Sequence, residues 1–228
     1  MLNILHGNQG AHMQHLFRNS QFWLILIIVV CIFTACLMMN GPMRDGLPVN
    51  PDFMQRMQYI QANIHLWQSG WLLWMLSALG LFTFCSILAD TLPASTYKRI
   101  GISFVLLGIA PDLSAEVIYA FIMPAVYAAY NSVESLFMLD KTAMFLTGFL
   151  GNGLYNLGGI ILNLLLYKTK KLPTWAIVWG LISWVTGLLL SAAIACDDLR
   201  LAELMTIFSM TSNTLWMLIF AYFGLRKC

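Results

Sequence analysis

Charged residues are scarce in this sequence: Lys, Arg, Asp and Glu make up only 10% of its 228 residues, whereas hydrophobic residues make up 60%. A soluble globular domain carries about 25% charged residues. This composition excludes a water-soluble protein and predicts an integral membrane protein. The formal net charge is only +2 and the sequence has no basic run, so nucleic acid is not an expected partner.

The sequence also lacks the motifs of the common enzyme and metal-site classes. It contains no GxSxG, P-loop, HExxH or CxxC pattern. Three of the four histidines, His6, His12 and His15, precede the first apolar segment, and His65 lies alone at the edge of the second. Because no apolar segment holds a histidine pair, a b-type haem or a catalytic zinc is disfavoured, and we expect no cofactor.

Sulfur-containing residues allow two weaker hypotheses. Of the five cysteines, Cys36 and Cys196 could form a disulfide on one side of the membrane. Soft ligands that could bind Cu(I) also gather in one region. They are Met38, Met39, Met43, Met54 and Met57, near Cys36 and His65. Methionine is common in apolar packing, which is the stronger explanation of this cluster.

Six apolar segments of bilayer length predict an all-α protein, a bundle of six transmembrane helices in a single domain. They cover residues 22–39, 65–88, 102–129, 143–166, 175–195 and 201–224. The first is longer than the apolar part of a usual signal peptide and no cleavage pattern follows it, so we interpret it as a retained span. This layout resembles that of many small bacterial inner-membrane proteins, a resemblance that implies no functional residues.

Lys and Arg are distributed unevenly between the two ends of these segments. Eight of the twelve fall at one end: Arg18, Lys98, Arg99, Lys168, Lys170, Lys171, Arg226 and Lys227. The positive-inside rule places this end, with both termini, in the cytoplasm. In the opposite, extracytoplasmic loop, residues 40–64, the sequence Asn50-Pro51-Asp52 predicts the start of a short surface helix, with Arg56 on its polar face.

The third apolar segment contains two acids at membrane depth. Asp112 and Glu116 are four residues apart, so on a helix they share one face, which Tyr119 continues. At about 1.5 Å per residue they lie roughly 20 and 25 Å past Arg99, inside a hydrocarbon core about 30 Å thick. Acids at this depth are costly and by default indicate function. Pro111 next to Asp112 predicts a kinked, broken helix there, with freed backbone groups beside the acids, and Pro124 predicts a second kink further along.

The fourth segment contains a polar stripe at matching depth, made of Gly148, Asn152, Asn156, Gly159 and Asn163. We predict that Asp112 and Glu116 face the bundle interior close to Asn152 or Asn156, since a lipid-facing charge costs roughly 3 kcal/mol or more. Because the two carboxyl groups repel each other, at least one should carry a proton near neutral pH unless a cation lies between them. Together with Tyr119, and with Glu203 near the start of the sixth segment, these residues form the candidate ligand- or proton-binding site.

Two structural explanations of the acids compete with a site. In the first, the membrane helix begins at Pro111 and Asp112 is an ordinary residue of its first turn. In the second, both acids are protonated and bonded to the amides of the fourth segment, with no ligand.

Three functions remain open from the sequence. The first is a transporter, channel or membrane component that binds a small solute or cation through the acid pair. The second is an intramembrane enzyme acting on lipid or peptide with Asp112, Glu116 or Glu203 as acid–base groups. The third is an accessory subunit, for which Ser183, Gly187 and Ser191 form a small-residue face suited to packing or oligomerisation.

Overall fold

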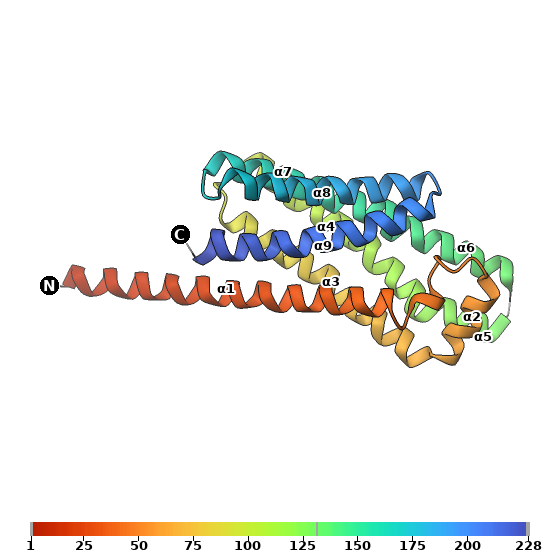
Figure 1. Ribbon diagram of the computed structural model, residues 1–228. Helices are drawn as coiled ribbons and strands as arrows, with labels where there is room; N and C mark the ends of the chain where they lie inside the picture. Colours follow the sequence, from red (N-terminus) through yellow and green to blue (C-terminus); the bar gives the residue numbers. More distant parts are fainter. Residues whose placement is uncertain (1, 131, 227–228) are drawn as a thin grey trace.

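The computed structural model is a bundle of long helices, shown in Figure 1. The structure describes residues 2–130 and 132–226, and the side chains of residues 18–129 and 132–225. Within these residues all regular structure is helical, and six stretches are long and apolar enough to cross a membrane. The predicted fold class is therefore confirmed.

The six stretches are close to the predicted segments, and three of them combine α-helical and π-helical parts. The first, second and fifth belong to α1 (Leu2–Asn40), α3 (Ile64–Asp90) and α8 (Thr174–Ala195). The third consists of α4 (Thr96–Val117), a π-helical segment (Ile118–Ile122) and α5 (Met123–Tyr130). The fourth consists of α6 (Val133–Met144), a π-helical segment (Phe145–Gly151) and α7 (Asn152–Thr169). The sixth consists of α9 (Leu199–Phe220) and a π-helical segment (Ala221–Arg226).

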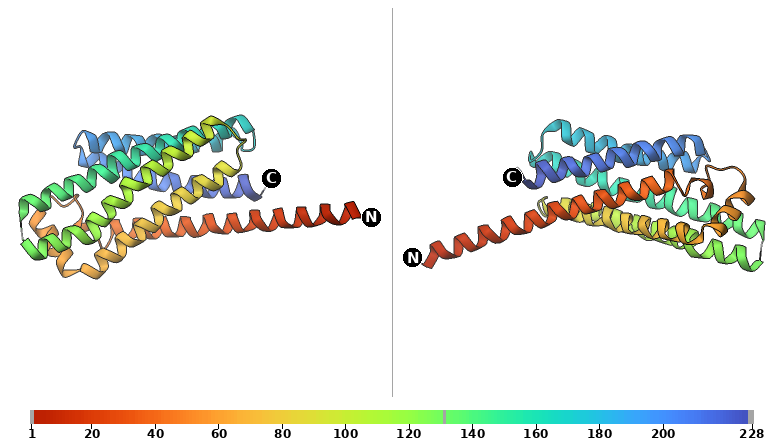
Figure 2. Two further views of the ribbon diagram at one scale, coloured as in Figure 1. Left: turned by 180° about the vertical axis from the view of Figure 1, so that it is seen from behind. Right: turned by 60° about the horizontal axis from the view of Figure 1, so that its bottom comes forward.

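The two ends of the bundle differ in structure. One end, called here the termini end, has both chain termini near it, and α1 extends beyond the bundle there, as Figure 2 shows from two sides. The opposite end, the α2 end, carries a 3₁₀ turn (Arg44–Gly46) and the short helix α2 (Phe53–Ala62). The Asp52 carboxylate caps α2 by accepting a hydrogen bond from the Gln55 N–H at 3.0 Å. The sequence predicted a short helix in this loop that starts near Asn50. The residue that caps it is Asp52, two positions later.

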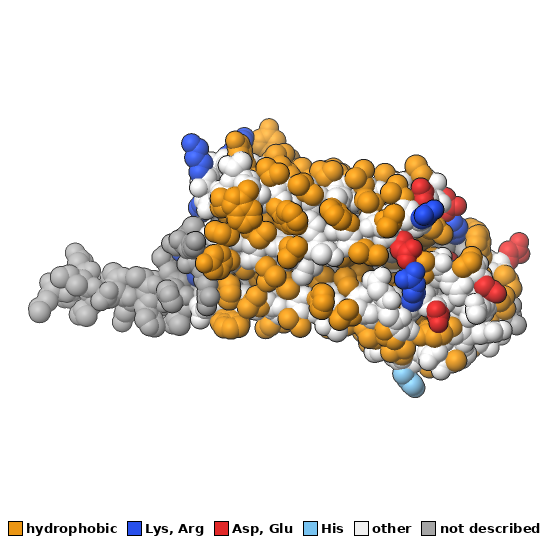
Figure 3. Space-filling model, viewed as in Figure 1, with side chains coloured by type: hydrophobic (Ala, Val, Ile, Leu, Met, Phe, Trp, Pro, Cys, Tyr) orange, Lys and Arg blue, Asp and Glu red, His pale blue; other side chains and the backbone are white. Residues whose placement is uncertain are grey.

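The surface of the bundle is suited to lipid over its middle. In Figure 3 hydrophobic side chains cover the central part. Lys and Arg side chains appear at both ends, whereas the acidic side chains in this view gather at the α2 end. A central band of exposed apolar side chains is suited to contact with the hydrocarbon layer of a membrane. The assignment of the termini end to the cytoplasm stays a prediction. The side chains of Arg226 and Lys227, which it counts, lie outside the described residues, as do those of His6, His12 and His15.

Helix α4 continues through Pro111, so the predicted break at this proline is wrong. The alternative in which the membrane helix begins at Pro111 is also wrong, because α4 begins at Thr96 and is capped by the Ser95 hydroxyl. The irregular segment comes later, at Ile118–Ile122, just before Pro124. Proline has no N–H and its ring clashes with the carbonyl four residues earlier, and a wider π-helical turn relieves both problems.

Glycines bring the third and fourth spans into backbone contact. A Cβ atom on Gly108 would lie 2.6 Å from the carbonyl oxygen of Gly151, and one on Gly158 would lie 2.5 Å from that of Gly101. Only glycine permits such an approach, which is a common way for membrane helices to pack. This contact holds the middle of α4 against the π-helical segment Phe145–Gly151.

The small-residue face of α8 lies inside the protomer. Ser183 is hydrogen-bonded to Ser212 of α9, with 2.6 Å between the hydroxyl oxygens, and Ser191 accepts a hydrogen bond from Asn152 of α7 at 2.9 Å. Gly187 leaves room for the amide of Asn156. These three residues therefore join α8 to α7 and α9 within one chain.

Candidate ligand site at the bundle centre

Asp112 and Glu116 lie inside the bundle, at the middle of the third span. That span, Thr96–Ala129, has 34 residues, and Asp112 stands halfway along it. Only 4% of the Asp112 surface and 0% of the Glu116 surface is exposed. The helix continues on each side of the two acids far enough to reach a membrane surface, so both acids are far from bulk water.

Asp112 is held by the neighbouring span. The Thr147 hydroxyl, from the π-helical segment Phe145–Gly151, donates a hydrogen bond to Oδ1 of Asp112. Within the described part of the chain, no Lys, Arg or His forms an ion pair with Asp112. Sequence reasoning did not single out Thr147, because a threonine in an apolar helix usually bonds its own backbone.

Glu116 has no hydrogen-bond partner among the residues that the structure describes. Both of its carboxyl oxygens are buried, and neither takes part in a hydrogen bond there. An isolated ionised carboxylate away from water is strongly disfavoured, and even a neutral polar group costs free energy when its hydrogen bonds are not made. The alternative in which both acids are bonded to amides therefore does not describe Glu116.

The amide stripe of the fourth span faces α8 rather than the acids, which corrects the sequence-based expectation. Asn152 Nδ2 donates to the Gly187 carbonyl oxygen at 2.6 Å, and Asn156 Nδ2 donates to Asn152 Oδ1 at 2.8 Å. No hydrogen bond joins either amide to Asp112 or Glu116. Asn152 and Asp112 do line the same small cavity of about 40 Å³.

Tyr119 connects the centre to a buried ion pair at the α2 end. Its hydroxyl donates to the backbone carbonyl of Asp140 at 3.3 Å, and its ring stacks on Trp71 with 4.6 Å between centroids. The Asp140 carboxylate binds the Arg56 guanidinium through two hydrogen bonds of 2.8 and 3.0 Å. Arg56 also donates to the Gly46 carbonyl oxygen at 3.2 Å.

The burial of Arg56 corrects the expectation that it lies on the polar face of the surface helix. Only 4% of its surface is exposed, and α2 turns it toward α6. The sequence contains an indication that Arg56 is buried. It is three residues after Phe53 and four before Ile60, so it shares the helix face of these apolar residues.

Glu203 lies apart from the other predicted site residues. Its carboxylate forms an ion pair with Arg44 at 2.8 Å, and the side chains of Arg44 and Glu203 are 49% and 34% exposed. Both line a cavity of about 190 Å³ at the α2 end. The structure therefore brings Asp112 and Asn152 to one small cavity, keeps Glu116 buried one helical turn from Asp112, and places Glu203 at the surface.

A larger cavity, called here the chamber, lies between the α2 end and the centre. Its volume is about 530 Å³, and it is bounded by α1, α3, α9 and the third, fourth and fifth spans. It shares Met39 and Thr206, among others, with the cavity around Glu203. It also shares Asn152 and Tyr155 with the small cavity that Asp112 lines. The three cavities thus form a series from the α2 end to Asp112.

The disulfide considered between Cys36 and Cys196 is not formed, whereas the copper hypothesis for the methionines stays a prediction. Cys36 and Cys196 are both free thiols. Met43 and Met57 are buried in an apolar cluster with Trp67. Among the described residues, no group of three or more His, Cys, Asp and Glu is arranged to hold a metal ion.

No known protein family, characterised protein or solved structure matches this chain.

Proposed function

We propose that this protein is a transporter, or a solute-binding component of one, that binds a small solute in the chamber and uses Asp112 and Glu116 to hold protons. The observation that carries the proposal is the series of cavities from the α2 end to Asp112. A volume of about 530 Å³ is within the range of small-molecule sites, roughly 300–1,000 Å³. A buried acid at the inner limit of such a cavity is typical of ion and proton pathways.

The residues around the chamber divide into two roles. Asn152 and Tyr155, which border both the chamber and the Asp112 cavity, contact the polar part of the solute. Tyr119 forms part of the chamber wall. Asp112 holds a cation or a proton, and the unpartnered Glu116 holds a second proton one helical turn away.

The geometry gives less support to the two other functions. Intramembrane acid–base catalysis needs acids on facing helices, but Asp112 and Glu116 share α4 and Glu203 is engaged with Arg44 at the surface. An accessory subunit would be expected to have a dry, fully paired centre. Here the oxygens of Glu116 are unpartnered and the chamber is large.

The proposal is tested by proton movement that depends on a solute. The full chain is reconstituted in liposomes with a trapped pH-sensitive dye, a pH gradient is imposed, and alkylamines, alcohols, amino acids and sugars are added in turn. We expect at least one of these classes to accelerate the decay of the gradient. The Asp112→Asn variant should abolish this effect, because its amide cannot exchange a proton at neutral pH.

Asp90→Asn is the matched control, since Asp90 is an exposed acid at the termini end. It should behave as the wild type. If no solute class moves protons, or if Asp112→Asn retains the full effect, the proposed function is wrong.

We also propose that the protein lies in a bacterial-type inner membrane with both termini in the cytoplasm. The excess of Lys and Arg at the termini end supports this orientation. Cys196 is an exposed thiol at the α2 end and offers a test without mutation. An impermeant thiol reagent added to intact cells should modify Cys196 but not a Lys170→Cys variant on a Cys196→Ser background. The opposite result would invert the topology.

A further inference from the structure

The chamber has an elongated wall formed by matching stripes of two helices. Four lining residues of α1 follow helical spacing, namely Val29, Phe33, Cys36 and Asn40. Lining residues of α9 do the same, namely Ile207, Thr211, Thr214, Leu215 and Leu218. Both stripes therefore border the same chamber along several helical turns.

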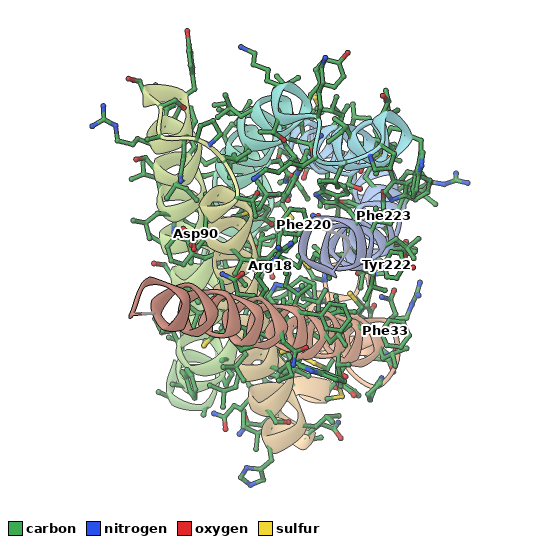
Figure 4. The ribbon with its side chains drawn as sticks, turned by 90° about the vertical axis from the view of Figure 1, so that its left-hand side faces the viewer. Arg18, Phe33, Asp90, Phe220, Tyr222 and Phe223 are labelled. Carbon is green, nitrogen blue, oxygen red and sulfur yellow. The ribbon has the colours of Figure 1, made fainter. Side chains whose placement is uncertain are left out.

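This pair of helices is closed at the termini end and open toward the α2 end. At the termini end Ile25 and Ile28 of α1 share one buried cluster with Phe220 and Leu225. Figure 4 views the bundle from this end, with Phe220 labelled beside α1. Toward the α2 end, α1 and α9 diverge, as Figure 1 shows, and the chamber lies there.

The rims of this opening face the lipid. Phe33 on α1 is 59% exposed and Ile207 on α9 is 47% exposed, and both line the chamber. Their neighbours Val30 and Phe208 are also exposed and apolar. A molecule in the hydrocarbon layer on the α2 side can therefore reach the chamber sideways without crossing a polar surface.

The wall opposite this opening is polar and has an acid behind it. Thr147, Asn152 and Tyr155 line the chamber there, with Asp112 immediately behind Thr147. Among the described residues, Asp112 is the only charged one that lines either the chamber or the small cavity beside it.

Among the described residues, Oδ1 of Asn213 has no hydrogen-bond partner, and this residue is 8% exposed and lines the small cavity. The carboxyl oxygens of Glu116 and Oδ1 of Asn156 are also buried without a partner there, one helical turn from Asp112 and from Asn152, although neither residue lines any of the three cavities. A region with unpartnered acceptors, an acid and no basic residue is complementary to a ligand that brings a positive charge and N–H donors.

From these observations we infer that the solute is an amphipathic cation that enters from the membrane between α1 and α9. Its apolar part occupies the slot between Phe33 and Leu215, and its cationic head lies against Thr147 and Asn152, next to Asp112. This inference rests on the proposed function, for which it names the class of solute and the route in. A lipid acyl chain without a cationic head is the competing occupant, and the acid and unpartnered acceptor beside the polar wall disfavour it.

The test uses three ligands that share one alkyl chain: decylammonium, decanol and decanoate. Cys36 lines the chamber and serves as a native reporter, whereas the exposed Cys196 lies outside it and is the internal control. The full chain in lipid nanodiscs is modified with methyl methanethiosulfonate, and each thiol is followed by mass spectrometry. We expect decylammonium to slow modification of Cys36 about tenfold more than decanol does, as one ion pair in a buried site would give.

In the same experiment decanoate should not protect Cys36, and none of the ligands should protect Cys196. Asp112→Asn should remove the advantage of decylammonium over decanol, and Asp90→Asn should keep it. Equal protection by decylammonium and decanol would identify a lipid chain as the occupant and overturn the inference. Absence of any protection would overturn it too, while solute-dependent proton movement in liposomes would still support the proposed function.

A second measurement tests the place of binding. Decylammonium should raise the unfolding temperature of the wild type and of Phe208→Trp, a control on the lipid-facing side of α9. Thr214→Trp, which fills the chamber, should lose this shift. A full shift in a folded Thr214→Trp variant would contradict the inference. If that variant does not fold, the protection of Cys36 in the wild type still decides whether decylammonium binds in the chamber.

Discussion

Buried charges occur in two regions of this molecule, and the two regions treat them in opposite ways. At the α2 end, Arg56 and Asp140 form a bidentate pair, and further hydrogen bonds come from Arg56 to Gly46 and from Tyr119 to the Asp140 backbone. At the centre, Glu116 has no hydrogen-bond partner in the described structure, and Asp112 has only the Thr147 hydroxyl. The charges of the first region are balanced, and the acids of the second are not.

This difference separates a structural role from a functional one. A buried pair whose hydrogen bonds are all made is destabilising to break, whereas a buried acid without partners costs stability as long as it is present. Such a cost is tolerated where the group must remain free to take a proton or a ligand. The contrast therefore predicts opposite effects when acids of the two regions are replaced.

The largest effect is expected at the α2 end. Asp140→Leu leaves the Arg56 guanidinium buried without its partner, and this should lower the free energy of unfolding by about 3–5 kcal/mol. Reversible unfolding of the full chain in mixed micelles measures the change. The double variant Arg56→Met with Asp140→Leu should recover most of the loss, because it removes the charge as well as the partner. A double variant as unstable as the single one would show that packing, not charge, dominates there.

Replacement of Glu116 should act in the opposite direction. Glu116→Leu removes two unpartnered oxygens from the interior and should raise the free energy of unfolding by about 1–3 kcal/mol. If an amide of the fourth span were bonded to Glu116, as the sequence predicted, the same substitution would strand that amide and be destabilising, but the described residues include no such partner. Glu116→Gln has nearly the same shape and polarity as the protonated acid and should leave stability almost unchanged. A destabilised Glu116→Leu variant would mean that Glu116 has a partner after all.

Tyr119 lies between the two regions and should show an intermediate effect. Tyr119→Phe removes the hydroxyl that donates to the Asp140 carbonyl and keeps the stacking on Trp71. The loss of one neutral hydrogen bond should lower the free energy of unfolding by about 1 kcal/mol. Tyr119→Ala removes the stacking too and should cost several times more. Equal effects of Phe and Ala would assign the whole contribution to the hydroxyl.

The exposed ion pair provides the lower limit of the comparison. Arg44→Gln breaks the pair with Glu203, whose side chains are substantially exposed, and should change stability by less than about 1 kcal/mol. The effect should shrink further in high salt, unlike that of Asp140→Leu. A loss as large as that of Asp140→Leu would remove the distinction between buried and exposed pairs on which the comparison depends.

The helical spans and the depth of the acids could be predicted because they depend on local pattern. Apolar runs of bilayer length separated by short polar loops allow little besides spanning helices, since backbone groups in lipid must be paired within the segment. The four-residue spacing of Asp112 and Glu116 then puts both on one face. The cost of exposing that face to lipid indicated that it turns inward, and both side chains are buried.

The neighbours of those acids could not be predicted, because they depend on how each helix is rotated against the next. The amide stripe of α7 was a plausible partner by depth, but the glycines at 101, 108, 151 and 158 bring α4 and the fourth span together along a different face. The amides therefore face Gly187 and Ser191 on α8, and a threonine from a π-helical segment faces Asp112.

The sequence by itself determined that this chain is a six-span helical bundle with two acids at mid-depth, because hydrophobic length and helical periodicity are properties of single segments. Only the tertiary structure decided that Arg56 is buried against Asp140, that Glu116 is left without a partner and that a chamber lies between α1 and α9. These features arise where residues far apart in the chain meet. A hydrogen bond or a cavity depends on distances of a few ångströms between segments, which no pattern within one segment specifies.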